Sequence, residues 1–509
     1  MRDVLRSMDR LGYSLSVPIR YEKTVYAHQG DVQHPVLSLL DMLQYMVKNQ
    51  SHLLLGGHSL DDPAGTWKDI LLQFWARYEC HDPGHPMWQD IPASDRNKCI
   101  PLMVYGDEGT GKRKQPVWLL CWKPTLFAAT NSYHRTMLYT CVSHVLYSDF
   151  HCGMDGGNEC LDPLVRSFAL EARRAYTEGI VWSGPGGDVR LRFVFTGVVG
   201  DMPFQGHLYK LKRHFTAADI CPLCLCKKDD AGEVSQNPSW LPTMGVSVPW
   251  DTSSPPEISI VPGLGRPEAI RPDIFHLGHL GICRDVYLGC IISLAMVFGH
   301  FGGKAVRSLD GKLANAYQLF KSYCHLRHST PFAKHWTREN FNFKGPRYPD
   351  CSFKASDSYL ILKWLEDYLS GPPWDDSTGI LGLMLSTIVA LSYTSPSRQW
   401  LRDSLAKQVE QSLQTFLSDY YKLALWAYRS GVLVYRFVPK LHAWKHIHLR
   451  LQGELALARG YTFNPAIYAT ANDEDFVGKA SRPIRDLHSG NASLRRLELY
   501  RIELQREWG

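Results

Sequence analysis

Long apolar runs are scarce in this sequence. The two most apolar stretches, residues 288–298 and 379–393, fall short of the roughly 20 residues that a membrane-spanning helix needs, so we expect them to be buried helices. The first ten residues, MRDVLRSMDR, lack the apolar core of a secretory signal. We therefore expect a soluble, intracellular protein with no membrane partner.

A strong excess of either charge is also absent. Lys and Arg number 56 against 50 Asp and Glu, a net charge of +6, which permits a nucleic-acid partner without requiring one. The basic residues are grouped, however, at 112–114, 210–214 and 482–506, and each group is either a basic groove or an ordinary solvated face. Hydrophobic residues make up 45% of the 509 residues, which argues against long disorder and allows about three domains, or one domain with a large insertion.

A disulfide framework is not evident either. Thirteen Cys is an odd number, and most stand singly within apolar segments, which indicates buried thiols in a reducing compartment. The exception is Cys221-Pro-Leu-Cys224-Leu-Cys226, whose first two cysteines have the spacing of a zinc knuckle. Cys226 is a spare or substitute ligand. A redox CxxC should follow a strand and open a helix, and that context is missing.

Two histidine pairs could complete a zinc site. His442 and His446 are four residues apart, so they share one face of a helix and make a Cys₂His₂ site possible. His276 and His279 are the second pair, to which we assign no chemistry. Taken alone, each pair is better explained by core or capping histidines.

The order of predicted elements begins with a sheet. Apolar runs predict strands at 100–105, 116–122 and 137–147, an amphipathic helix at 161–179, a strand at 191–199 and a basic helix at 204–215. Three antiparallel strands, a helix and a further strand are the opening topology of the ribonuclease-H fold. Long helical patterns with almost no strand signal then fill the next 200 or so residues: 274–298, 313–325, 358–369, 379–393 and 399–430.

Two aspartates stand where predicted strands end. Asp107 closes the first strand and Asp201 closes the fourth, and acids at these two places lie side by side in the ribonuclease-H fold. Such carboxylates can bridge two divalent ions about 3.5–4 Å apart, and they are the hard oxygen ligands that Mg²⁺ or Mn²⁺ prefers. The alternative is that each Asp is only a turn residue, because Asp beside Gly is common in turns.

Residues 106–113, GDEGTGKR, also match the spacing of a phosphate-binding P-loop. Arg113 stands where the Ser or Thr that holds Mg²⁺ would be. A predicted strand follows, whereas a P-loop needs a helix whose N-terminus holds the phosphate. We therefore do not expect a nucleotide site here.

Taken together, these motifs resemble the CACTA group of DDE transposases, which are similar in layout to hAT transposases and to the V(D)J recombinase core. The resemblance covers about residues 96–490 and rests on motif order: Asp107, Asp201, the CxxC, the helical insertion, Pro439-Lys440-x-His442-x-x-x-His446 and the acids at 473–475. It implies that Glu474 is the third catalytic acid. It also implies that one structural zinc pins the insertion to the core through Cys221, Cys224, His442 and His446, with His448 a rival for the last place.

The resemblance defines the fold class and the domains that we expect. The fold is α/β, a ribonuclease-H-like mixed sheet interrupted by a large all-α insertion. Residues 1–95 form a mixed, mostly helical N-terminal region with helix signals at 36–47 and 69–78. The core begins at 96–226, the insertion occupies 227–438, and 439–509 hold the zinc-closing motif and the final core helices.

The function implied is metal-dependent DNA strand cleavage and transfer by a transposable-element enzyme. Asp107, Asp201 and Glu474 would hold two Mg²⁺ or Mn²⁺ ions, and the chain would act on DNA in the nucleus as a homo-oligomer. Candidate phosphate contacts are the basic residues near these motifs: Lys112, Arg113, Lys114, Lys210, Lys212, Arg213 and Lys479.

Two alternatives stay open. One is a catalytically inactive scaffold, derived from such an enzyme and stabilised by zinc, that binds DNA or protein. The other is a ribonuclease-H-like exonuclease, which would need a fourth acid such as Glu108 or Asp475.

Overall fold

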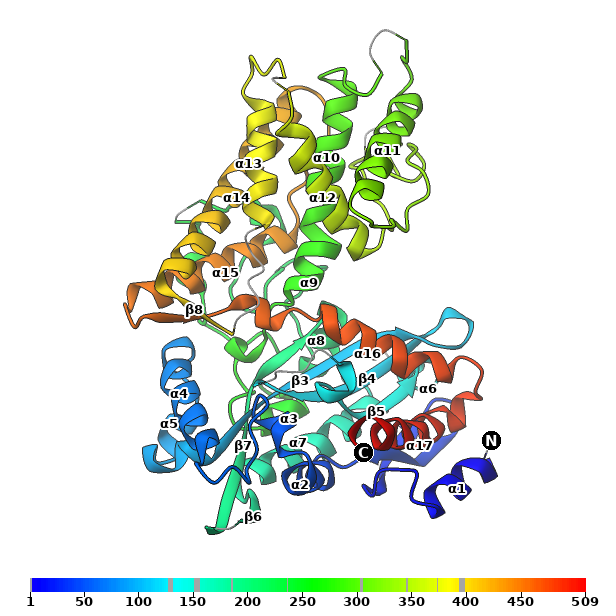
Figure 1. The fold of residues 1–509 in the computed structure, drawn as a ribbon, viewed down its shortest axis with the longest axis vertical. Coiled ribbons are helices and arrows are strands. Elements are labelled where there is room, and N and C mark those ends of the chain that lie inside the picture. Colours follow the sequence, from blue (N-terminus) through cyan, green and yellow to red (C-terminus); the bar gives the residue numbers. More distant parts are fainter. Residues whose placement is uncertain are drawn as a thin grey trace. The chain divides into compact units, whose positions relative to one another are not determined.

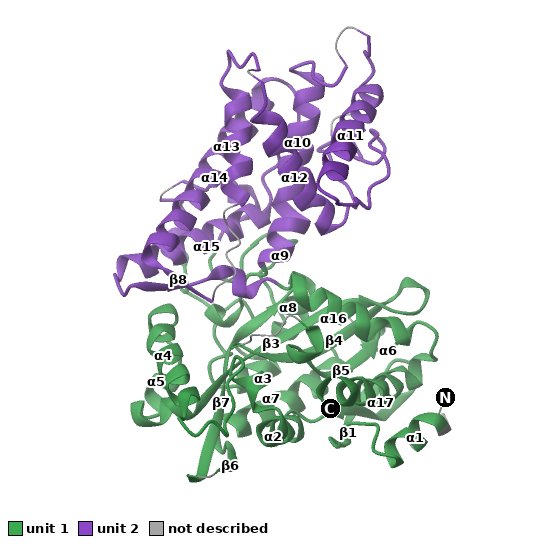
Figure 2. Cartoon of the chain, in the orientation of Figure 1, with its two compact units in different colours: residues 1–225, 243–273, 470–509 green, residues 226–242, 274–469 purple. Residues whose placement is uncertain are grey.

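The computed structural model describes residues 2–126, 131–150, 156–184, 186–235, 237–302, 305–344, 347–372, 374–392 and 399–509. The chain divides into two compact units (Figures 1 and 2). Unit 1 consists of residues 1–225, 243–273 and 470–509, and unit 2 consists of residues 226–242 and 274–469.

Unit 1 is built on a curled, mixed five-stranded sheet with the order β5-β4-β3-β7-β6. Its strands are β3 (Cys99–Thr110), β4 (Pro116–Pro124), β5 (Met137–Ser143), β6 (Ile180–Gly184) and β7 (Gly187–Gly200). Strands β3, β4 and β5 are antiparallel neighbours, β7 pairs parallel to β3, and β6 forms an antiparallel hairpin with β7. An isolated parallel bridge also joins Val198 to Ile270 beyond β7.

The central strands are buried along nearly their whole length. Strands covered on both faces carry near-continuous apolar runs, which is why these segments were recognisable in the sequence. Helix α7 (Leu161–Thr177) packs against β7, α16 (Ala471–Ser481) against β3, and α17 (Ser489–Trp508) against β5. Helix α8 (Met202–Tyr209) follows β7 directly.

The turn expected at Asp107 was a wrong prediction. Strand β3 runs through Asp107 to Thr110, and Asp107 pairs with Leu119 of β4. Gly106 does not end the strand. It serves close packing instead, since a Cβ at this position would stand 1.9 Å from the Phe204 ring. The predicted third strand was also too long, because β5 ends at Ser143 and a short helix, α6 (His144–Tyr147), follows.

The N-terminal part of unit 1 is more mixed than predicted. It begins with α1 (Arg2–Arg10) and a hairpin of β1 (Ile19–Tyr26) and β2 (Gly30–Leu37), and the hairpin was not foreseen. Helices α2 (Leu39–Asn49), α3 (Ser51–Leu54), α4 (Thr66–His81) and α5 (Met87–Asp90) follow. Ser38 caps α2 by accepting a hydrogen bond from the backbone of Asp41, so the helix signal expected from residue 36 begins three residues later.

Unit 2 is almost entirely helical. Its helices are α9 (Ile274–Leu277), α10 (Cys283–Met296), α11 (Leu309–Leu326), α12 (Ala355–Leu369), α13 (Ile380–Ser392), α14 (Asp403–Arg429) and α15 (Pro439–Ala456). A π-helical turn, Gly278–Ile282, joins α9 to α10. Strands β8 (Trp400–Arg402) and β9 (Tyr461–Phe463) form a short antiparallel pair. Tyr393, the last residue of the helix expected at 379–393, lies outside the described residues.

One helical segment of the described chain, Ile274–Met296, is long and apolar enough to cross a membrane. Of its most apolar window, 78% is buried inside the fold. A core helix passes the same test, so the segment is weak evidence for a membrane span.

Candidate functional site

Asp107 and Glu474 are far apart in the sequence and meet in unit 1. Asp107 is buried on β3, and Glu474 lies in the first turn of α16, the helix that packs against β3. A carboxylate oxygen of each residue lies within 4.8 Å of the other. Two opposite ligands of one Mg²⁺ ion are about 4.2 Å apart, so both acids can approach one ion with small side-chain adjustments.

The three consecutive acids of α16 have three different surroundings. Asp473 is buried and accepts hydrogen bonds from Lys123 Nζ and Thr136 Oγ1 at 2.5 and 2.7 Å. Asp475 is exposed and pairs with Lys479 at 2.6 Å. Glu474 is the member of this run that approaches Asp107, the place that the resemblance gives it.

Asp201 stands beside Asp107 in the sheet but belongs to a different local structure. Gly106 and Gly200 are paired in the parallel register of β3 and β7, so the two aspartates that follow them lie on neighbouring strands. Asp201 is also the N-cap of α8, and its Oδ1 accepts a hydrogen bond from Phe204 N at 2.8 Å. Among the described residues, the close group formed by Asp107 and Glu474 does not include Asp201.

The surroundings of these acids are strongly electrostatic. Burial raises the pKa of the Tyr105 hydroxyl well above its usual value, and the negative charges of nearby acids, Asp107 and Glu474 among them, raise it further. Tyr105 therefore remains a neutral hydroxyl beneath the carboxylates. Glu108, which we considered as a fourth acid for an exonuclease, instead accepts a hydrogen bond from Tyr147 at 2.8 Å.

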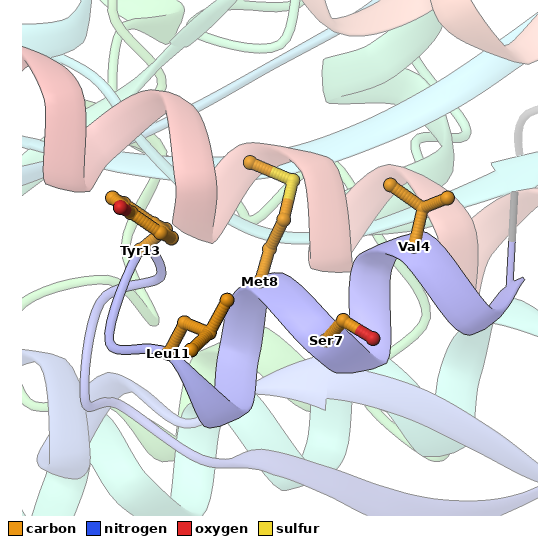
Figure 3. A pocket seen from close by; sticks show the side chains of 5 residues that line it. All are labelled: Val4, Ser7, Met8, Leu11 and Tyr13. Atoms are coloured by element: carbon orange, nitrogen blue, oxygen red, sulfur yellow. The ribbon is translucent and has the colours of Figure 1, made fainter.

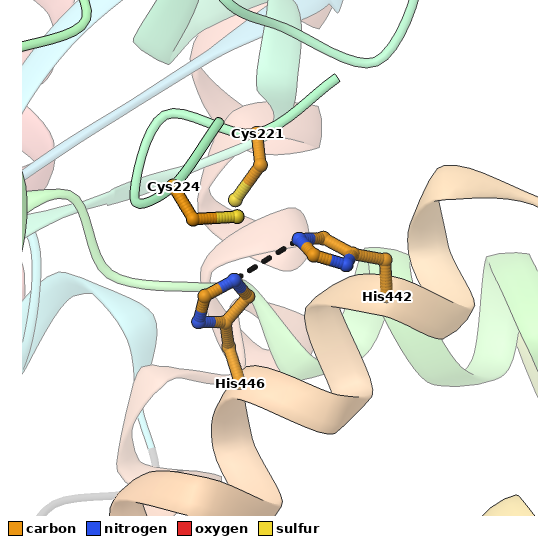
Figure 4. Close-up of side chains that lie close together, drawn as sticks. All are labelled: Cys221, Cys224, His442 and His446. Carbon is orange, nitrogen blue, oxygen red and sulfur yellow. Dashed lines mark hydrogen bonds between the residues drawn. The ribbon is translucent and has the colours of Figure 1, made fainter. Parts of the chain in front are cut away.

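A second group of potential ligands consists of Cys221, Cys224, His442 and His446 (Figure 4). All four side chains are buried, and one ligand atom of each lies within 4.8 Å of the others. Figure 4 shows the two sulfur atoms facing the two imidazole rings, whose Nε2 atoms are 3.0 Å apart. This Cys₂His₂ cluster can hold a metal ion, and its donor set is that of a structural zinc site.

Both halves of this cluster are held by their own surroundings. The Arg213 guanidinium donates to the carbonyl oxygens of Cys221 and Pro222, each at 3.2 Å, and so fixes the CxxC loop. The Trp240 ring packs on the two imidazoles, with centroids 4.3 Å from His442 and 4.8 Å from His446. A desolvated cluster of this kind excludes competing water from a bound ion.

The residues considered as substitute zinc ligands have other partners. His448 Nε2 contacts Glu410 Oε1 at 2.9 Å, and its Nδ1 contacts Lys445 Nζ at 3.2 Å. His448 is six residues from His442 and so points to a different side of α15. Cys226 lies in the same loop as Cys221 but outside the four-residue cluster, and its thiol donates to Lys227 O at 3.4 Å.

The basic residues predicted as phosphate contacts differ in availability. The basic helix expected at 204–215 was wrong, because α8 ends at Tyr209 and Lys210 adopts a left-handed conformation with φ 50°. Arg213 is buried in the CxxC loop, so it does not present its charge to a ligand. Lys210, Lys212 and Lys479 form ion pairs with Asp162, Asp251 and Asp475. The exposed residues are Lys112, Arg113 and Lys114, in the loop between β3 and β4.

A hollow beside α1 is unrelated to these groups. Its lining is mostly apolar (Figure 3): Val4, Ser7, Met8, Leu11 and Tyr13. It contains none of the acids, thiols or histidines considered above, so it suggests no chemistry. Comparison of the chain with protein-family models and with curated proteins finds no match.

Proposed function

We propose that this chain is a metal-dependent polynucleotidyl transferase of the DDE transposase type, with a ribonuclease-H-like core in unit 1. The observation that carries the proposal is the approach of Asp107 and Glu474, which stand at opposite ends of the chain's second insertion-bearing half yet share one site. The strand order is compatible with this fold, since three antiparallel strands are followed by a strand parallel to the first. The bridge between Val198 and Ile270 occupies the place of a further parallel strand.

In this proposal Asp107, Asp201 and Glu474 would hold two Mg²⁺ or Mn²⁺ ions. The donor set fits such ions, because carboxylate oxygens are the hard ligands they prefer. When bound, the ions activate a water or 3′-hydroxyl and stabilise the leaving oxygen of a phosphodiester. The protein's own contribution is to orient the carboxylates and the DNA strand.

The remaining parts of the proposal concern DNA and zinc. Lys112, Arg113 and Lys114 are exposed and suited to contact phosphates without reading sequence. The Cys₂His₂ cluster would hold one structural zinc. Nuclear location and self-association belong to the same proposal and follow from the resemblance alone.

The test is nicking of supercoiled DNA by the purified chain with Mn²⁺. We expect Asp107→Asn and Asp201→Asn to lower the nicking rate at least about a hundred-fold, because a metal ion supplies several kcal/mol and each 1.4 kcal/mol is tenfold. Asp475→Asn is the matched control, since this acid adjoins Glu474 but pairs with Lys479. Nicking by Asp107→Asn at the parent rate would reject the catalytic assignment.

A second candidate is the inactive, zinc-stabilised scaffold that binds DNA or protein. The observation that favours it is the hydrogen bond of Asp201 to the start of α8, which occupies one of its carboxylate oxygens. A parent chain that retains DNA in a binding assay but shows no Mn²⁺-dependent nicking would select this candidate.

A further inference from the structure

The buried ion pair of Lys123 and Asp473 has no part in the chemistry proposed above. Lys123 Nζ lies 2.5 Å from Asp473 Oδ2, and the two side chains are 0% and 1% exposed. Thr136, also fully buried, donates to the other carboxylate oxygen at 2.7 Å. Well-packed apolar residues often stabilise a core as well as such a pair does, because desolvation offsets the attraction. The pair therefore calls for an explanation other than stability.

Asp473 attaches the first turn of α16 to the sheet. Lys123 belongs to β4, and Thr136 directly precedes β5, so both oxygens of one carboxylate are bound to neighbouring strands. Successive residues of an α-helix point about 100° apart. When Asp473 points toward β4 and β5, the next residue, Glu474, is turned toward Asp107 on β3.

A second attachment holds the beginning of the same helix. Thr470 directly precedes α16, and its backbone N–H and its hydroxyl donate to the two carboxylate oxygens of Asp273 at 3.1 and 2.5 Å. Both residues are buried. This contact locates the start of the helix, whereas the Asp473 contacts restrict its rotation about its own axis.

We propose that Lys123, Thr136 and Asp473 are positioning residues that set the rotation of α16 so that Glu474 faces Asp107. This inference rests on the proposed function. A Glu carboxylate lies about 5–6 Å from the helix axis, so a rotation of about 20° would move it by about 2 Å. That displacement is as long as a metal–oxygen bond and would remove Glu474 from a shared ion.

The experiment measures Mn²⁺ binding to the full chain by electron paramagnetic resonance, together with DNA nicking at several Mn²⁺ concentrations. The test variant is Lys123→Met/Asp473→Leu, which removes both charges and keeps similar volumes. We expect Mn²⁺ affinity to fall about tenfold or more, as it does when groups that orient metal ligands are removed. The half-saturating Mn²⁺ concentration for nicking should rise in parallel, and added Mn²⁺ should restore part of the rate.

The matched control is Arg496→Met/Glu503→Leu, which removes another pair with a fully buried cation from unit 1. It should leave Mn²⁺ affinity unchanged, so loss of a buried ion pair as such cannot explain the result. If the test variant does not fold, Thr136→Val removes a single hydrogen bond to Asp473 and should weaken Mn²⁺ binding in the same direction.

The outcomes separate the inference from the proposed function. Parent affinity for Mn²⁺ in a folded Lys123→Met/Asp473→Leu variant, or in Thr136→Val where the double variant does not fold, overturns the positioning role. A parent chain whose Mn²⁺ binding does not depend on Asp107 overturns the proposed function, and the inference with it.

Discussion

Replacement of Cys221 by Ser is the most direct test of the Cys₂His₂ cluster. In a tetrahedral site with Zn–N bonds of about 2.0–2.1 Å, two ligand nitrogens are about 3.3 Å apart. His442 and His446 already place their Nε2 atoms 3.0 Å apart, so a bound zinc requires only a small adjustment. A ligand present at a thousand times its Kd stabilises a folded protein by about 4 kcal/mol. Cys221→Ser should lose most of this contribution.

The assay is zinc content by elemental analysis, together with thermal unfolding before and after a chelator is added. We expect about one zinc per parent chain and a clear loss of both zinc and thermal stability in Cys221→Ser. Cys226→Ser is the matched control, because this buried cysteine lies in the same loop outside the cluster. A parent chain that contains no zinc, or a Cys221→Ser variant with parent zinc content and stability, would refute the reasoning.

Three further predictions concern packing, pH and DNA. Gly106→Ala should destabilise unit 1 by about 1–3 kcal/mol in urea unfolding, because its Cβ would meet the Phe204 ring; parent stability would contradict this packing. Burial lowers the pKa of His34 to about 3, so the unfolded chain binds a proton that the folded chain does not, and stability should fall by about 2 kcal/mol between pH 7 and pH 5. In His34→Gln this part of the pH dependence should disappear, and an unchanged slope would count against it. Lys112→Ala/Lys114→Ala should reduce the salt dependence of DNA binding by about 0.9 per lost phosphate contact in fluorescence anisotropy, and an unchanged dependence would exclude the loop.

The predicted sheet strands that the structure contains are those whose whole length is buried. Their sequences are continuous apolar runs, which need no information about distant partners. Strand β6 was missed because it is an exposed edge strand of five residues with a half-buried pattern. The signal that could have found it is the glycine-rich segment at 184–187, which joins β6 to β7 and is typical of a hairpin.

Asp107 shows why the strand ends were harder to predict. Gly106 and Gly109 on either side of this acid and Glu108 favour a turn when they are considered locally. In the fold both glycines pair with β4, and their lack of a side chain admits Phe204 and Ser481 from other elements. The role of these glycines depends on residues far away in the sequence, so local rules assign it wrongly.

The acids of α16 carry the same argument into the candidate site. Nothing in the residue types of Asp473, Glu474 and Asp475 says which one faces Asp107, and the choice of Glu474 came from the resemblance. The structure supplies a physical reason, because Lys123 binds Asp473 and Lys479 binds Asp475. The two partners lie on different elements, so neither can be paired with its acid from sequence spacing alone. The approach of Glu474 to Asp107 is thus a consequence of where its two neighbours find their cations.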